Sequence, residues 1–129
     1  MIVGIGTDIL LIDRISQVSY NLCDAFMQNT YTDDERKEAM AMDDPTLYFA
    51  TRYAGKEAVV KALGCDEIKE SFNQVEILSS SSSTTAACVT LYGEARSIAK
   101  SRNISGIMFS LSYDTDYAVS FAIAQSGEM

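Results

Sequence analysis

Residues 44–64, with the sequence DPTLYFATRYAGKEAVVKALG, carry the start and stop signals of one long helix. Asp44 can cap a helix start, Pro45 suits the first helical position, and Gly64 suits the position just past a helix end. Alanine recurs at every fourth position, so one ridge of small side chains lets another element approach closely. The ridge consists of Ala50, Ala54, Ala58 and Ala62. Most other positions are apolar, so the stretch predicts a mostly buried central helix.

Four charged residues interrupt this apolar helix: Arg52, Lys56, Glu57 and Lys61. Glu57 and Lys61 stand at i, i+4, a spacing at which opposite charges stabilise an exposed helix by ~0.2–0.5 kcal/mol. Arg52 and Lys56 have the same spacing but like charges, which repel by a similar amount. Two interpretations stay open for these cations. They form either a solvated pair or a site for an anion, for which phosphate has the best-suited charge and oxygens.

Length and composition predict one domain, residues 1–129. The sequence is 47% hydrophobic, has no apolar run of the ~18 residues that a membrane span needs, and begins without the basic flank of a secretory signal. We therefore expect a cytoplasmic protein that does not act at a membrane. A net charge of −8 argues against nucleic acid as a partner.

Cysteine and histidine usage limits the chemistry. Cys23, Cys65 and Cys88 are odd in number and widely spaced, and the chain has no His to complete a zinc site. Free thiols are thus expected. Any general acid or base must be a carboxylate, Lys, Tyr or water, because the commonest group that titrates near neutral pH is missing.

The first 42 residues predict a strand and two helices. Met1 to Ile5 is a short apolar run that ends in a tight turn, after which Asp8 is expected, from the residues alone, to cap a helix. The apolar positions of that helix are Ile9, Ile12, Ile15, Val18 and Leu22. A capping box at Thr32 and Glu35 predicts a second helix, which runs to Met42.

The chain after Gly64 predicts antiparallel strands. Strands are expected at residues 72–78, 87–92, 107–113 and 117–123, with a polar turn at 79–85 and a helix at 93–103. The last two strands are expected to form a hairpin. The fold class predicted is α+β: a single domain with an antiparallel sheet packed on the long central helix.

Two stretches resemble a known family. They are Gly4-Ile5-Gly6-Thr7-Asp8-Ile9 with Arg14-Ile15, and Phe49-Ala50 followed by residues 52–64, which contain Lys-Glu-Ala-x-x-Lys. Together they resemble holo-[acyl-carrier-protein] synthase, the small bacterial class of 4′-phosphopantetheinyl transferase. The resemblance implies an enzyme of fatty acid biosynthesis that moves phosphopantetheine from coenzyme A to a serine of an acyl carrier protein. It also implies release of adenosine 3′,5′-bisphosphate, a need for Mg²⁺, and a trimer with sites between subunits.

The resemblance assigns roles to particular residues. Asp8 and Glu57 would be the Mg²⁺ ligands, which replaces the cap expected for Asp8. Glu57 and Lys61 would be catalytic. Either Glu57 or a metal-bound water would deprotonate the carrier serine, and Lys61 would offset charge on the pyrophosphate. Coenzyme A would be bound by Arg52, Lys56, Lys61 and Gly64, and the carrier protein by Arg14 and Phe26.

The chain departs from the family pattern where His usually flanks the Ser-x-Ser strand, since it has Met108 and Tyr113 there. It also has no basic residue between Arg14 and Thr32, where the family usually carries several Arg. An alternative to an active transferase is therefore a weak or silent homologue that binds coenzyme A or a carrier protein without turnover. A structural subunit without a ligand would leave the charges of the central helix unexplained.

Overall fold

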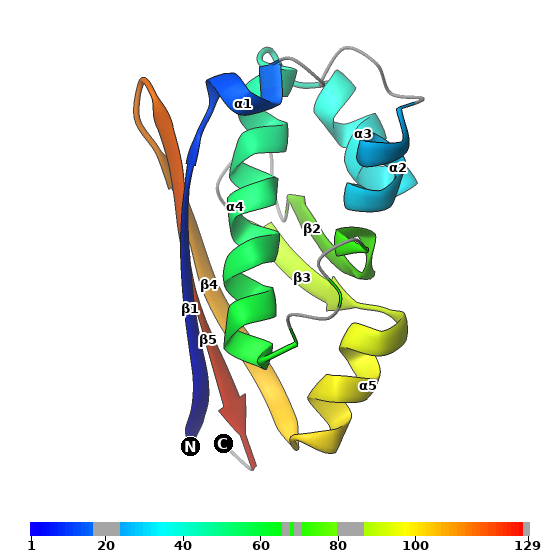
Figure 1. Ribbon diagram of the computed structural model, residues 1–129, viewed down its shortest axis with the longest axis vertical. Coiled ribbons are helices and arrows are strands. Elements are labelled where there is room, and N and C mark those ends of the chain that lie inside the picture. The colour runs from blue at the N-terminus through cyan, green and yellow to red at the C-terminus, as the bar shows by residue number, and fades with distance from the viewer. Residues whose placement is uncertain (17–23, 66–67, 69–70, 80–86, 128–129) are drawn as a thin grey trace.

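A computed structural model describes residues 1–16, 24–65, 68, 71–79 and 87–127. Two antiparallel sheets and one long helix dominate it, in line with the predicted α+β class (Figure 1). The strands are β1 (Ile2–Leu11), β2 (Val75–Ser79), β3 (Ala87–Leu91), β4 (Ile104–Tyr113) and β5 (Tyr117–Ser126). The helices are α1 (Asp13–Ser16), α2 (Ala25–Thr30), α3 (Asp33–Met40), α4 (Pro45–Leu63) and α5 (Gly93–Ser101), with a 3₁₀ turn at Phe72–Gln74. None of the described helices is long and apolar enough to cross a membrane.

Helix α4 begins and ends where the sequence predicts. The Asp44 carboxylate accepts a hydrogen bond from the Leu47 amide at 3.1 Å, and Gly64 adopts the left-handed conformation with φ of 70°. The capping box is also confirmed, because Thr32 and Glu35 exchange side-chain to backbone bonds at the start of α3. These local signals are strong because a helix end leaves backbone groups that only a few residue types can satisfy.

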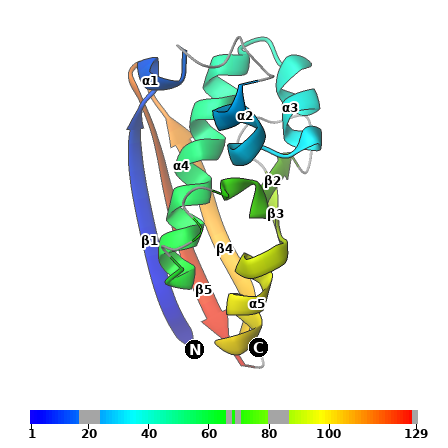
Figure 2. The same ribbon diagram turned by 45° about the vertical axis from the view of Figure 1, so that its right-hand side comes forward.

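The larger sheet has the order β1-β5-β4, and α4 lies along one of its faces (Figure 2). The alanine ridge allows the close approach. A Cβ added to Gly4 would lie 1.8 Å from the Ala62 carbonyl oxygen, and one added to Gly6 would lie 2.0 Å from that of Ala58. Only glycine lets β1 run this close to the helix.

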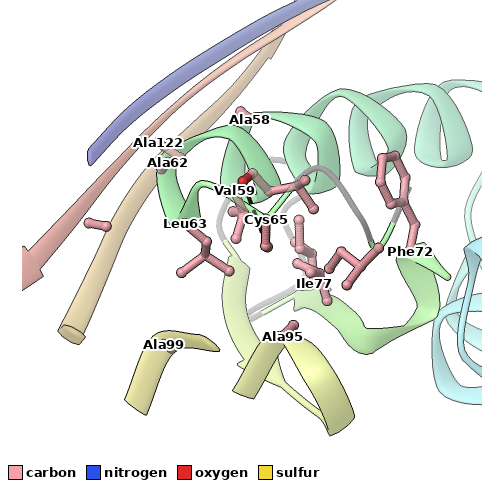
Figure 3. Close-up of a cluster of buried hydrophobic side chains, with 14 of the residues drawn as sticks. Ala58, Val59, Ala62, Leu63, Cys65, Phe72, Ile77, Ala95, Ala99 and Ala122 are labelled. Carbon is pink, nitrogen blue, oxygen red and sulfur yellow. Dashed lines mark hydrogen bonds between the residues drawn. The ribbon is translucent and has the colours of Figure 1, made fainter. Parts of the chain in front are cut away.

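The smaller sheet, β2-β3, lies on the other side of α4, and α5 closes that end of the molecule (Figure 1). Buried side chains from both sheets, α4 and α5 form one hydrophobic cluster there (Figure 3). Val59 and Leu63 of α4 meet Ile77 of β2 and Ala95 of α5 in this cluster. The central helix is therefore covered on several sides, as its composition predicts.

The prediction for the chain around Asp8 was wrong. Strand β1 continues through Asp8 to Leu11, because Ile9 and Leu10 pair with Val119 and Ala118 of β5. Asp8 is thus in mid-strand and caps no helix. Only Asp13–Ser16 of the predicted helix is helical among the described residues, and Val18 and Leu22 lie outside them.

Smaller differences occur elsewhere. Helix α2, capped by Asp24, was not predicted, and the strand expected from residue 72 begins at Val75 after the 3₁₀ turn. The predicted hairpin is confirmed, with both strands longer than expected. Most of the polar turn predicted at 79–85 lies outside the described residues.

Candidate active site

Asp8 and Glu57 lie in one pocket although they are 49 positions apart in the sequence. Asp8 comes from β1 and Glu57 from α4, and the pocket between them has a volume of about 330 Å³. Arg14, Phe26 and Tyr53 line the same pocket. The pocket therefore combines two carboxylates, one cation and two aromatic rings.

Lys61 supplies positive charge next to Asp8. Its Nζ lies 3.6 Å from Asp8 Oδ1 and donates a hydrogen bond to the Thr7 carbonyl at 2.9 Å. Burial and the neighbouring Glu57 raise the pKa of Asp8, and Lys61 counteracts part of that rise. Two carboxylates that repel each other in a half-buried place form a site that a cation would stabilise.

Glu57 makes no hydrogen bond or ion pair with any residue that the structure describes, although its side chain is partly buried. An unpartnered carboxylate beside a second carboxylate fits Mg²⁺, which takes one or two carboxylates and completes its octahedron with water and phosphate oxygens. No group of three or more Asp, Glu or Cys is gathered for a metal within the described ranges. The donor set thus fits Mg²⁺ held jointly by protein and substrate better than a metal held by protein alone.

The two residues predicted to bind the carrier protein lie in this same pocket. Arg14 is exposed, and its side chain forms no bond with the described residues. Phe26 stacks on Tyr53, with ring centroids 6.1 Å apart and an interplanar angle of 27°. The structure thus joins the predicted metal site and the predicted carrier site into one surface.

Lys56, which was predicted to bind coenzyme A, lies in the interior of the protein. Its side chain is fully buried, and its Nζ donates hydrogen bonds to Glu35 Oε1 at 2.7 Å, to the Phe72 carbonyl at 3.1 Å and to the Val75 carbonyl. Burial lowers the pKa of Lys56, and Glu35 opposes that shift. An anion was expected beside this cation from its like-charge spacing with Arg52. That anion is the carboxylate of Glu35.

Arg52 is also fully buried, and its guanidinium lies 4.1 Å from the ring centre of Tyr48. It donates hydrogen bonds to the Ile77 carbonyl at 3.3 Å and to Ser79 Oγ at 2.8 Å. In this conformation neither Arg52 nor Lys56 exposes surface to solvent. The coenzyme A role predicted for Arg52 and Lys56 stays a prediction, which the burial of both side chains does not favour.

Gly64 is exposed at the end of α4, one turn beyond Lys61. The guanidinium of Arg102 lies over it and donates hydrogen bonds to the carbonyls of Leu63 and Val3, the second at 3.1 Å. Arg102 was missed from the sequence, because it follows α5 and only the packing of distant segments brings its side chain to the end of α4. The coenzyme A role predicted for Gly64 and Lys61 stays a prediction.

Sequence reasoning also missed Tyr53 as a pocket residue. Burial raises the pKa of its phenol, and Glu57 and Asp8 raise it further. A signal was present, because Tyr53, Glu57 and Lys61 are each four positions apart and so lie on one stripe of α4.

The face of the larger sheet that α4 does not cover carries exposed apolar side chains. Ile5, Ile9, Met108 and Phe121 keep 58–70% of their surface accessible. Register aligns Ile5 with Ile123 and Ile123 with Met108 across the three strands. A continuous apolar face of this kind is typical of protein interfaces.

The comparisons with known proteins agree with one another. A family model described as the 4′-phosphopantetheinyl transferase superfamily matches residues 4–122. A holo-[acyl-carrier-protein] synthase from Natranaerobius thermophilus is 33% identical over 126 residues, which are 98% of this chain and 99% of that protein. The crystal structure of holo-[acyl-carrier-protein] synthase from Neisseria meningitidis is 30% identical with a TM-score of 0.78, covering 98% of this chain and 100% of that one.

A holo-(acyl-carrier-protein) synthase from Bacillus anthracis, solved in complex with CoA (3′,5′-ADP), is 27% identical with a TM-score of 0.74. The match covers 98% of this chain and 99% of that one.

Proposed function

The chain belongs to the 4′-phosphopantetheinyl transferase superfamily, and from that membership we propose that it is an active holo-[acyl-carrier-protein] synthase. It transfers the phosphopantetheine arm of coenzyme A to a serine of an acyl carrier protein and releases adenosine 3′,5′-bisphosphate. The observation that carries the proposal is the pocket that Asp8 and Glu57 line together, with Lys61 beside Asp8.

In the transfer, the serine oxygen attacks the phosphorus next to the pantetheine arm, and the bond from that phosphorus to the leaving phosphate breaks. Glu57 has no protein partner among the described residues and accepts the serine proton. The Lys61 ammonium, 42% exposed, offsets the charge that grows on the leaving phosphate. The enzyme supplies no nucleophile of its own, so its contribution is positioning and charge neutralisation.

We assign Mg²⁺ to Asp8 and Glu57. When bound, the ion would neutralise the pyrophosphate, which the net charge of −8 on this protein would otherwise repel. Coenzyme A would lie toward Lys61 and Gly64 at the end of α4. Arg14 and Phe26 would receive the carrier protein at the mouth of the pocket.

The apolar sheet face supports self-association. Burying large exposed side chains such as Ile5, Ile9 and Phe121 between copies stabilises an assembly by ~25 cal/mol per Å² of apolar area. The resemblance implies that this assembly is a homotrimer. Met108, which stands where the family usually has His, lies on this same face and would be at the interface.

The alternative is a homologue that binds coenzyme A or a carrier without turnover, favoured by Met108 and Tyr113 in place of two His. One experiment separates the two functions. The protein is incubated with coenzyme A, Mg²⁺ and an apo acyl carrier protein, and the carrier mass is followed. Gain of one phosphopantetheine, abolished by a chelator and restored by Mg²⁺, supports the transferase; an unchanged carrier mass despite measurable coenzyme A binding supports the silent homologue.

A further inference from the structure

The stripe of Tyr53, Glu57 and Lys61 on α4 changes its chemistry from one residue to the next. Successive members are four residues apart, roughly 6 Å along the helix axis. They present a neutral hydroxyl, a carboxylate and an ammonium. Glu57, the residue proposed to hold the metal and take the serine proton, is in the middle.

Two aromatic rings fix the ring of Tyr53. It stacks on Phe26 at 6.1 Å and packs against Phe72 at 5.5 Å with an interplanar angle of 55°. A ring held on two sides places its hydroxyl in a defined position. This rigidity is a requirement for a group that orients a ligand.

The hydroxyl of Tyr53 makes no hydrogen bond with any residue in the described part of the chain. It stays protonated at neutral pH, since an ordinary tyrosine loses its proton only near pH 10. It can therefore both donate and accept a hydrogen bond with a ligand in the pocket. By contrast, the hydroxyl of Tyr48, which is also on α4, donates a hydrogen bond to Glu38 at 2.9 Å.

The two ends of the stripe have different neighbours. Tyr53 is next to Phe26 and shares the pocket wall with Arg14, both proposed carrier contacts. Lys61 lies outside that wall, toward the end of α4. Phosphoryl transfer needs the attacking and leaving oxygens roughly in line on opposite sides of the phosphorus. The stripe therefore has an acceptor end at Tyr53 and a leaving-group end at Lys61.

We propose that the Tyr53 hydroxyl hydrogen-bonds the accepting serine hydroxyl of the carrier protein and orients it toward the phosphorus. This inference rests on the proposed transferase function. Tyr53 keeps its own proton throughout, while the serine proton goes to Glu57, the new serine–phosphate bond forms and the bond to adenosine 3′,5′-bisphosphate breaks. Tyr53 is thus a substrate-positioning residue, not a base.

A double-mutant cycle at equilibrium tests the contact without relying on turnover. The affinity of wild-type enzyme and Tyr53→Phe is measured for an apo carrier and for the same carrier with its accepting serine changed to alanine, all without coenzyme A. A neutral hydrogen bond corresponds to about a three- to ten-fold change in affinity. We expect Tyr53→Phe to lose this factor for the serine carrier and nothing for the alanine carrier.

Two further measurements complete the test. Calorimetric affinity for coenzyme A should be unchanged in Tyr53→Phe, and kcat/KM for the carrier should fall with KM for coenzyme A constant. Tyr92→Phe is the matched control, because Tyr92 is exposed, donates to Glu76 at 3.0 Å and lies outside the pocket. It should leave all of these quantities at the wild-type level.

Equal losses for both carriers would show that Tyr53 only packs against the docked protein, and weaker coenzyme A binding would place its hydroxyl on a phosphate. Either result, or no change at all, overturns the inference. Failure of the proposed function looks different. In that case the wild-type enzyme itself transfers nothing to the carrier, whatever Tyr53→Phe does.

Discussion

Replacing Lys56 with Met should destabilise the protein by about 3 kcal/mol and leave coenzyme A affinity unchanged. The change removes three hydrogen bonds from Nζ, to Glu35, Phe72 and Val75, in a place with no exposed surface. Breaking a buried ion pair by removing one partner costs about 3–5 kcal/mol. The lower figure applies, because the Glu35 carboxylate still accepts from the amides of Thr32 and Ile77, each at 2.8 Å or less.

The loss can be measured by urea unfolding followed by far-ultraviolet circular dichroism, at one fixed protein concentration. A thermal melt gives a second measure. The unfolding entropy of 129 residues is roughly 0.27 kcal/mol per kelvin, so the same loss of free energy should lower the melting temperature by about 11 °C. Lys100→Met is the control, since Lys100 is exposed and should shift the melting temperature little.

Adding Glu35→Gln to Lys56→Met should recover part of the loss, because the uncompensated buried charge is then removed, although Gln keeps an acceptor oxygen for only one of the two amides. If Lys56→Met were as stable as the wild type but bound coenzyme A much more weakly, the structural role of Lys56 would be refuted.

Three further predictions concern the pocket and its supports. Burial raises the folded-state pKa of Asp8 above its ordinary value of 3.8. Between the unfolded-state and folded-state pKa values the native state binds more protons than the unfolded state, so the protein loses stability as pH rises through that range. Asp8→Asn should thus be inactive but more stable than the wild type at neutral pH, with the gain vanishing below pH 3.8 in urea titrations; equal gains at every pH would contradict this. Arg14→Ala should slow transfer to the carrier without changing coenzyme A affinity, and salt across the physiological range should change the wild-type rate only a few-fold, as one or two contacts screened over ~8–10 Å allow; a steep salt dependence would show that the carrier docks elsewhere. Gly6→Ala should lower the free energy of unfolding, measured in urea, by more than about 3 kcal/mol, since the added Cβ would lie 2.0 Å from the Ala58 carbonyl oxygen. Gly106→Ala is the control and should be tolerated, because the added Cβ would meet nothing nearer than 3.9 Å.

The sequence was most informative where a residue type answers a local backbone need. Asp44 and Gly64 mark both ends of α4 because they satisfy the groups that a helix leaves open at its termini. The alanine ridge of α4 and the glycines of β1 likewise predict and permit a close approach. Such signals depend on a few neighbouring residues, so they can be read without knowing the rest of the fold.

Asp8 shows where local signals mislead. A Gly-x-Gly run followed by Asp is typical of a strand end and a helix cap, but pairing with β5 carries the strand on to Leu11. That pairing joins segments more than 100 residues apart, so no window around Asp8 could contain the decisive contact. Lys56 and Glu35 give the same lesson, because the buried partner of the cation comes from another helix, 21 positions earlier.

The pocket itself combines both kinds of information. Glu57 and Lys61 could be chosen from their spacing together with a family resemblance, whereas the shared location of Arg14, Phe26 and Asp8 required the fold. Tyr53 could have been found from its spacing, because it lies four positions before Glu57 on the same stripe of α4.

Phosphopantetheine transfer by Glu57→Gln, compared with the wild type, tests most directly the claim that this pocket performs the reaction. The substitution keeps the size of the side chain but removes its charge, and the wild-type carboxylate has no partner among the described residues that the fold would lose. With saturating coenzyme A, Mg²⁺ and carrier, we expect the wild type to add one phosphopantetheine to the carrier by mass. We expect Glu57→Gln to add none while keeping the wild-type circular dichroism spectrum and melting temperature. Transfer by the folded variant at a rate near that of the wild type would contradict the assignment of the active site to Asp8, Glu57 and Lys61.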